Sequence, residues 1–167
     1  MEMQLQGHQW SRRAPVWPAA IVAGLAAGAV LMVLELVWAA MLGDRDPWIL
    51  SRHVAAIVMG REILQATTFD VVVVGVALAT HYLLGIFSGL VVGALIAGFH
   101  WETSLGMMQA IGAAFGAVIY LVNFHVLTAL FPWFSDLRGW ATFIGHLVFG
   151  MSAALLYWWL SRRTVER

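Results

Sequence analysis

Two stretches, Tyr120-Leu121-Val122-Asn123-Phe124-His125 and His146-Leu147-Val148-Phe149-Gly150, decide the fold of this chain. Each places polar side chains inside a run that is otherwise almost wholly apolar. Apolar runs of such length are typical of helices in a lipid bilayer, where a polar side chain without a partner is costly. We therefore expect these groups to face the interior of a helical membrane protein.

The composition of the 167-residue chain also indicates a membrane protein. Hydrophobic residues make up 62% of the chain and charged residues 11%, whereas a soluble domain has about 25% charged residues. The formal net charge is zero, so no basic surface favours nucleic acid as a partner. Because the chain has no cysteine, disulfides, thiolate metal sites, iron–sulfur clusters and covalent haem attachment are excluded.

Four runs are long enough to span a bilayer, which takes about 20 mostly apolar residues. They cover residues 16–42, 71–98, 105–131 and 140–160. The first run is too long for the core of a signal peptide, so we predict a retained spanning helix. A shorter apolar piece, 54–59, lies between the first two runs. We expect it to form a short helix that lies at the membrane interface or dips into the protein.

Short polar side chains precede two of these runs. Thr68 or Asp70 is the expected N-cap of the second run. Thr103 or Ser104 stands ahead of the third run.

Arginines flank the apolar region at both ends, at Arg12, Arg13, Arg162, Arg163 and Arg167. The positive-inside rule therefore places both termini in the cytoplasm, as an even number of spans requires. We predict a cytoplasmic tail over 1–15, a single transmembrane domain over 16–161 and a second cytoplasmic tail over 162–167.

The chain resembles two copies of one helical hairpin. Three pairs of matching segments occur in the same order, namely 24–30 with 112–118, Pro47-Trp48 with Pro132-Trp133, and 81–85 with 146–150. Ordered matches of this kind favour duplication over chance similarity among apolar helices. We therefore expect an all-α, four-helix transmembrane bundle of two parallel hairpin repeats, about 16–98 and 104–161, with a pseudo-twofold axis along the membrane normal.

Small residues at helical spacing predict close contacts between these helices. Gly24 and Gly28 in the first run form a small-xxx-small pattern, as do Gly112 and Gly116 in the third. Such patterns let two helix backbones approach each other closely.

A layer of polar side chains is predicted in the outer half of the membrane. Counted from the outer ends of their helices at about 1.5 Å per residue, its members all lie roughly 10–17 Å deep. They are Glu35, His81, Asn123 and His146. His125 shares this depth, but it is two residues from Asn123 and therefore points to a different face, toward another helix pair or a partner subunit.

Three interpretations of this layer stay open. The first is a structural network in which Glu35 bonds one histidine and Asn123 bonds the other, so that the helices are locked in register. The second is a cofactor site, either a b-type haem between His81 and His146 or a divalent metal held by Glu35, His81, His125 and His146. The third is a proton or ion path through Glu35 and the histidines.

A further set of segments carries a family resemblance: Asp46-Pro47-Trp48, 52–60, Thr68-Phe69-Asp70, 120–124, 128–134 and 146–150. Through these segments the chain resembles, over about residues 20–160, a family of short, uncharacterised four-span bacterial inner-membrane proteins. Some members of that family carry an automatic sodium:proline symporter label. The resemblance implies a bacterial inner-membrane location and no mechanism. The symporter label is implausible, because those transporters are far longer and use broken helices around a midplane substrate site.

These patterns favour a non-catalytic integral membrane protein, such as a small accessory or structural subunit of a membrane complex. Its expected surroundings are the lipid bilayer and either a second copy or a partner within a membrane complex. A haem- or metal-binding protein and a small proton or ion conductor are the alternatives. The sequence shows no nucleophile–base pair and no phosphate-binding glycine loop, so we do not expect an enzyme without a cofactor.

Overall fold

The computed structural model describes residues 14–41, 46, 48–99 and 104–165. Four helices among these residues are long and apolar enough to cross a membrane, namely Trp17–Met41, Val71–Gly98, Leu105–Ala129 and Trp140–Arg163. The prediction of an all-α bundle with four long apolar helices is therefore confirmed. Most of the two predicted tails, with Arg12, Arg13 and Arg167, lies outside the described residues.

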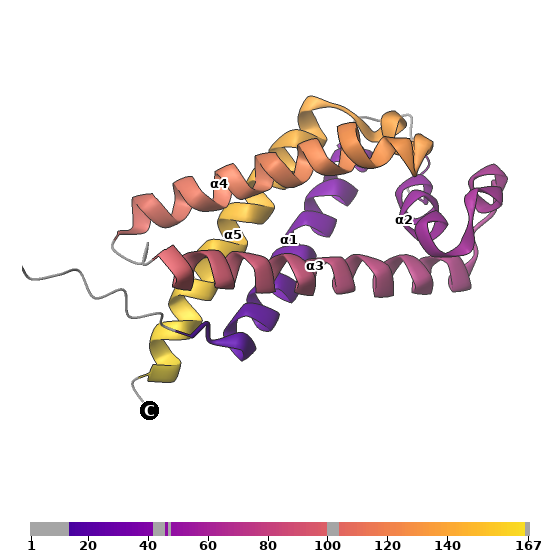
Figure 1. The fold of residues 1–167 in the computed structure, drawn as a ribbon. Coiled ribbons are helices and arrows are strands. Elements are labelled where there is room, and N and C mark those ends of the chain that lie inside the picture. The colour runs from indigo at the N-terminus through magenta and orange to yellow at the C-terminus, as the bar shows by residue number, and fades with distance from the viewer. Residues whose placement is uncertain (1–13, 42–45, 47, 100–103, 166–167) are drawn as a thin grey trace, which may run out of the picture.

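Two helical hairpins form the bundle. The first consists of α1 (Trp17–Met41) and α3 (Val71–Phe99), and the second of α4 (Leu105–Leu121) and α5 (Trp140–Val165). Helix α1 packs against both α3 and α5, and α5 packs against α4. Figure 1 shows α3 and α4 both running across α1 and α5, with α4 above α3 in this view. Among the described residues α3 and α4 share no extended contact. The two hairpins therefore meet mainly through α1 and α5, which are the central helices of the bundle.

The start of α1 and the end of α5 lie at the same end of the bundle. The backbone N–H of Val16 donates to the hydroxyl of Tyr157 at 3.3 Å. We call this the inner end, and the opposite end, where α2 lies, the outer end (Figure 1). The core near the inner end is apolar and closed, since Ala20, Ile96 and Ala154 have no exposed surface.

Glycines bring the helix backbones into direct contact within each hairpin. A Cβ built on Gly85 of α3 would lie 2.9 Å from the carbonyl oxygen of Gly24 on α1. A Cβ built on Gly112 of α4 would lie 2.5 Å from the carbonyl oxygen of Gly150 on α5. Both distances are below van der Waals contact, so a larger residue would push the helices apart. The predicted close contacts are confirmed at both crossings.

The connection between α1 and α3 contains a short helix, α2 (Ile49–Met59), followed by a 3-10 turn, η1 (Arg61–Gln65). Helix α2 packs on α3 through a small apolar cluster of Ala55, Val73 and Ala77. The helix expected over 54–59 is therefore present, but it begins earlier, at Ile49.

Asp46 organises the start of α2. Its Oδ1 accepts the backbone N–H of Trp48 at 2.9 Å, and its Oδ2 pairs with the Arg52 guanidinium. This bond with Arg52 holds the pKa of the Asp46 carboxyl below its ordinary value of 3.8.

Polar caps begin α3 and α4, as the sequence predicts. The Oδ1 of Asp70 accepts the backbone N–H of Val72 at 2.7 Å, so Asp70 rather than Thr68 caps α3. The Oγ of Ser104 accepts the backbone N–H of Met107 at 3.2 Å and caps α4.

The third predicted span is present over Leu105–Ala129, but it is not α-helical throughout. Helix α4 ends at Leu121 and passes into a π-turn, η2 (Val122–Val126), in which the N–H of Leu127 donates to the carbonyl of Val122. A π-turn inserts one extra residue and so changes the direction of the side chains that follow it. The 3-10 turns η3 (Leu127–Ala129) and η4 (Pro132–Leu137) complete the connection to α5, which extends beyond the predicted residue 160 to Val165.

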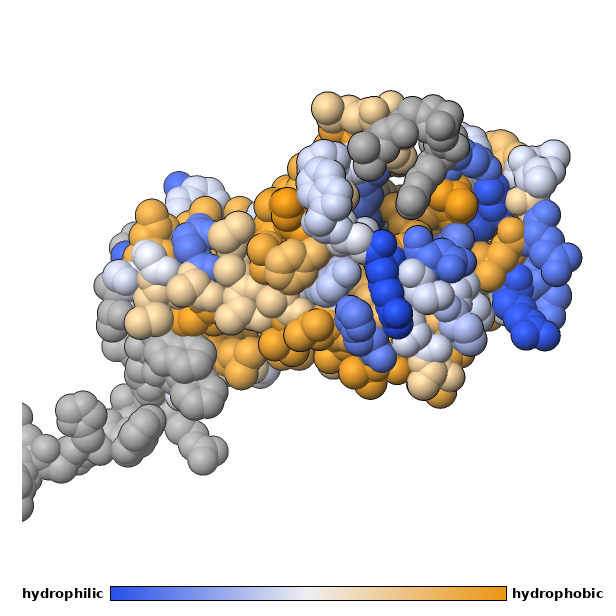
Figure 2. Space-filling view, turned by 90° about the horizontal axis from the view of Figure 1, so that it is seen from above, coloured by the Kyte–Doolittle hydropathy of each residue, from blue (hydrophilic) through white to orange (hydrophobic). Residues whose placement is uncertain are grey.

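The surface of the long helices is apolar. In Figure 2, hydrophobic residues cover the middle of the molecule, and hydrophilic residues gather at the right-hand end, where Figure 1 places α2 and η1. Large exposed apolar side chains include Leu83, Phe87, Val118, Leu121 and Trp159. Such a band is expected of helices in contact with a lipid bilayer.

Candidate binding cavity

A cavity of about 290 Å³ lies between the helices toward the outer end. Its walls come from α1, α2, α3, α4, α5 and the turns η2 to η4. Most of the lining is aliphatic or aromatic. Its polar members are Glu35, His81, Ser88, Asn123, Thr142 and His146. A mainly apolar cavity with a few polar groups, near the lower end of the usual size range, is typical of a small-molecule site.

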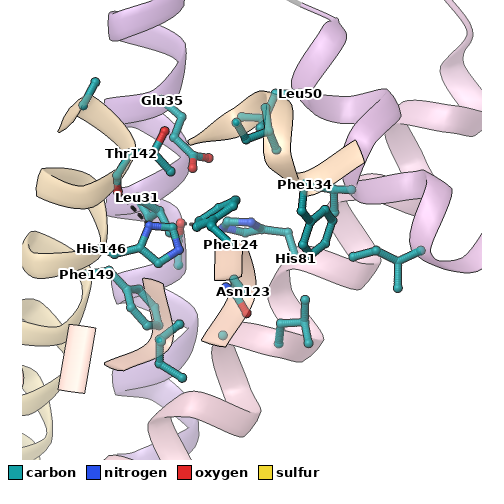
Figure 3. Close-up of a pocket in the computed structure, with 18 of the residues that line it drawn as sticks. Leu31, Glu35, Leu50, His81, Asn123, Phe124, Phe134, Thr142, His146 and Phe149 are labelled. Carbon is teal, nitrogen blue, oxygen red and sulfur yellow. Dashed lines mark hydrogen bonds between the residues drawn. The ribbon is translucent and has the colours of Figure 1, made fainter. Parts of the chain in front are cut away.

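The structure brings the four residues of the predicted polar layer to this one cavity. Glu35 comes from α1, His81 from α3, Asn123 from η2 and His146 from α5. Figure 3 shows their side chains around a common space. His125 is not among the lining residues; it is exposed, and its ring packs against Tyr120 with centroids 5.9 Å apart.

Helix α1 holds the ring of His81. The Nε2 of His81 lies 2.9 Å from the carbonyl oxygen of Gly28. Because a carbonyl oxygen can only accept, Nε2 of His81 donates in this hydrogen bond, and in the neutral form of the ring Nδ1 is the acceptor.

His146 instead forms a hydrogen bond within its own helix. Its Nδ1 lies 2.8 Å from the carbonyl oxygen of Thr142, so Nδ1 carries the proton and Nε2 is the free acceptor. The side chain is only 5% exposed, and it packs edge-on against Phe124 with ring centroids 5.3 Å apart. A Cβ on Gly116 would overlap the carbonyl oxygen of His146. The backbones of α4 and α5 therefore leave no room for the ring between them, and it turns toward the cavity.

The Glu35 carboxylate is half-buried and forms no hydrogen bond or ion pair with any described residue. Figure 3 shows it turned toward the space that it shares with His146 and Phe124. Neither imidazole forms a hydrogen bond with Glu35 or Asn123, and each bonds a backbone carbonyl oxygen instead. The partners expected for a structural network are therefore not the ones observed.

The geometry does not favour the metal or haem interpretations. Among the described residues, no group of three or more His, Cys, Asp or Glu side chains is placed to hold a metal ion. A haem between His81 and His146 would need both imidazoles to face one iron. The Nε2 of His81 is committed to Gly28, and in the view of Figure 3 the Phe124 ring lies between the two imidazoles. Both interpretations stay predictions.

Two elements that close the outer side of the cavity, α2 and η4, were not predicted from the sequence to line it. Leu50, Val54 and Ile57 of α2 line it. Their spacing of four and then three residues is that of one helix face, and this signal was available in the sequence. The element η4 adds Phe134 and Leu137 to the lining.

Helix α2 is tied to η4 through His53. The indole Nε1–H of Trp133 donates to the carbonyl oxygen of His53 at 3.1 Å. The Nε2 of His53, a residue only 6% exposed, lies 3.9 Å from the Asp136 carboxylate. These contacts join two connections that are far apart in the sequence, and they fix the outer wall of the cavity.

Four candidate spans with a cavity between them define the chain as a multi-span membrane protein. Comparison with models of known protein families, with curated proteins and with solved structures finds no match. The resemblance to short four-span bacterial inner-membrane proteins therefore stays a prediction.

Proposed function

We propose that the chain is a non-catalytic integral membrane protein that binds a small amphipathic molecule in the cavity between its helices. One observation carries this proposal: polar side chains from four different elements line a single, mainly apolar cavity. They are Glu35, His81, Asn123 and His146. In such a site the apolar wall contributes affinity, and the few polar groups orient the ligand.

The closed inner half favours binding over conduction. A proton or ion path needs polar groups or water along its length. Below the cavity, the described core contains Ala20, Ile96 and Ala154 without exposed surface, and Tyr157 with 1%. Within the part of the chain that the structure describes, the polar layer therefore meets an apolar core, as a binding pocket does.

The arrangement of the helices supports entry of a ligand from the bilayer. The outer helices α3 and α4 both line the cavity without packing extensively against each other in the described residues. Leu84, which lines the cavity on α3, is 52% exposed. A molecule dissolved in the lipid can therefore reach the cavity laterally, between α3 and α4.

The proposal also includes an internal duplication of the helical hairpin and an orientation with both termini in the cytoplasm. The crossings use glycines at matching positions of the two proposed repeats, Gly24 with Gly85 and Gly112 with Gly150. Arg162 and Arg163 lie in α5 at the inner end, which the positive-inside rule assigns to the cytoplasm. A bacterial inner membrane, and a second copy or membrane complex covering part of the apolar surface, are consistent with this arrangement.

Filling the cavity tests the proposal. We would measure binding of three radiolabelled probes, phenylbutylamine, pentylbenzene and phenylpentanoate, to the protein in phosphatidylcholine nanodiscs, with empty nanodiscs as the blank. Ala39 lines the cavity, whereas its neighbour Ala40 is exposed and does not. We expect Ala39→Phe to abolish the binding of whichever probe binds, and Ala40→Phe to leave it unchanged. Binding of no probe above the blank, or equal binding by both variants, would refute the proposal.

A further inference from the structure

The lining of the cavity carries one carboxyl group and no permanently cationic side chain to match it. Its lining residues include Glu35 but no lysine or arginine. The carboxylate has no hydrogen-bond or ion-pair partner among the described residues. Because an unpaired carboxylate in an apolar, membrane-embedded site is costly, the site favours a positive charge brought by the ligand.

The two histidines add acceptors rather than donors. The Nε2–H of His81 donates to the carbonyl oxygen of Gly28, and the Nδ1–H of His146 donates to the carbonyl oxygen of Thr142. In its neutral form each imidazole therefore keeps one nitrogen that can only accept a hydrogen bond. That nitrogen on His146 belongs to a side chain that is 5% exposed and lines the cavity.

The donors that remain in the lining are all uncharged. They are the hydroxyls of Ser88 and Thr142, the amide of Asn123 and the indole of Trp38. An anion would find no charged donor here. A ligand with a positive charge and several N–H groups matches the available acceptors, since each such bond is charge-assisted.

The aromatic side chains of the lining suit both the apolar part of such a ligand and its positive charge. Aromatic rings of Trp38, Phe124, Phe131, Phe134 and Phe149 face the cavity. Aromatic faces attract organic cations as well as apolar groups. A bare divalent metal has no apolar part to contact these rings and is not an organic cation. The described side chains are also not grouped to coordinate such a metal.

We infer that the ligand of this cavity is a protonated amine on a small apolar body, with its ammonium group at the Glu35 carboxylate. This inference rests on the proposed function, because it specifies the chemical class of the molecule that the cavity binds.

The three probes separate charge from shape. Pentylbenzene replaces the ammonium group of phenylbutylamine by a methyl group, and phenylpentanoate replaces it by a carboxylate. We expect the protein in nanodiscs to bind phenylbutylamine most tightly. Glu35→Gln should lower the affinity for phenylbutylamine by about tenfold or more and leave that for pentylbenzene unchanged, which also shows that the variant keeps its cavity. Glu62→Gln is the matched control, because Glu62 is exposed and outside this cavity.

The outcomes distinguish the two proposals. If pentylbenzene binds as tightly as phenylbutylamine, or Glu35→Gln leaves amine binding unchanged, the cavity is a binding site but the assignment to an amine is wrong. Tighter binding of phenylpentanoate overturns the assignment as well. If none of the probes binds, the proposed function fails, and this inference fails with it.

Discussion

At the scale of single residues, hydrogen-bond partners decide the chemistry of the two cavity histidines. His81 and His146 each stand four residues before a glycine. His81 reaches across to the neighbouring helix, whereas His146 bonds its own helix because the α4 and α5 backbones touch beside it. The free nitrogens consequently differ, Nδ1 in one ring and Nε2 in the other. A substitution at either histidine should therefore not be read as equivalent to one at the other.

The Asp46 carboxylate gives a prediction about pH. Its bond with Arg52 lowers its pKa below 3.8, so the folded state takes up this proton less readily than the unfolded state. The pair therefore stabilises α2 above pH 3.8, and this stabilisation is lost as the pH falls through the folded-state pKa. We expect the hydrogen-exchange protection of α2 amides to fall in that range. Asp46→Asn should show lower protection at neutral pH and a flatter response to acid.

Glu62→Gln provides the comparison for this experiment, since it also removes one carboxyl group near α2. An acid-dependent loss of protection that persists unchanged in Asp46→Asn would show that the ion pair is not its cause.

At the scale of elements, the glycines of the helix crossings give a matched pair of variants on α4. A Cβ at Gly112 would lie 2.5 Å from the Gly150 carbonyl oxygen, whereas a Cβ at Gly106 would meet nothing within 4 Å. We expect Gly112→Ala to destabilise the protein by about 1–3 kcal/mol through overpacking. Gly106→Ala should be neutral or slightly stabilising, because alanine favours helix over glycine.

Thermal unfolding in detergent measures both variants. If the two alanine variants unfold at the same temperature, α4 and α5 do not approach as closely as described.

The sequence predicts the long helices well and the break in α4 poorly. Length and hydropathy suffice for α1, α3 and α5, because an apolar run of bilayer length has few alternatives to a helix. Residues 122–126 lie in the same candidate span as the residues before them, so length and hydropathy do not mark a π-turn there. Their π-turn depends on contacts made by the folded chain, such as the packing of Phe124 on His146 and Phe134. The amino-acid composition of the segment does not predict those contacts.

At the scale of the whole molecule, the depth of the polar layer could be predicted from the sequence, but the arrangement of the helices around it could not. Counting residues from helix ends places Glu35, His81, Asn123 and His146 at one level, and the structure places all four in one cavity. The spanning helices are apolar all round, so periodicity does not reveal which helices are neighbours. The central position of α1 and α5, and hence the separation of α3 from α4, required the structure.

The wall formed by α2 and η4 shows the same limit. A helix face of Leu50, Val54 and Ile57 was visible in the sequence, but its partner was not. The bond from Trp133 to the carbonyl of His53 joins the two connections across the bundle. Only the folded molecule shows that the parts outside the long helices complete the cavity.

Solid-state nitrogen NMR of the histidine side chains in lipid bilayers tests the shared cavity most directly, with resonances assigned through His81→Asn and His146→Asn variants. We predict that the hydrogen-bonded ring N–H is Nε2–H in His81 and Nδ1–H in His146, with contacts from the His146 ring to that of Phe124. The reverse assignment of these N–H groups, or a His146 ring whose contacts are to lipid acyl chains, would contradict the shared cavity.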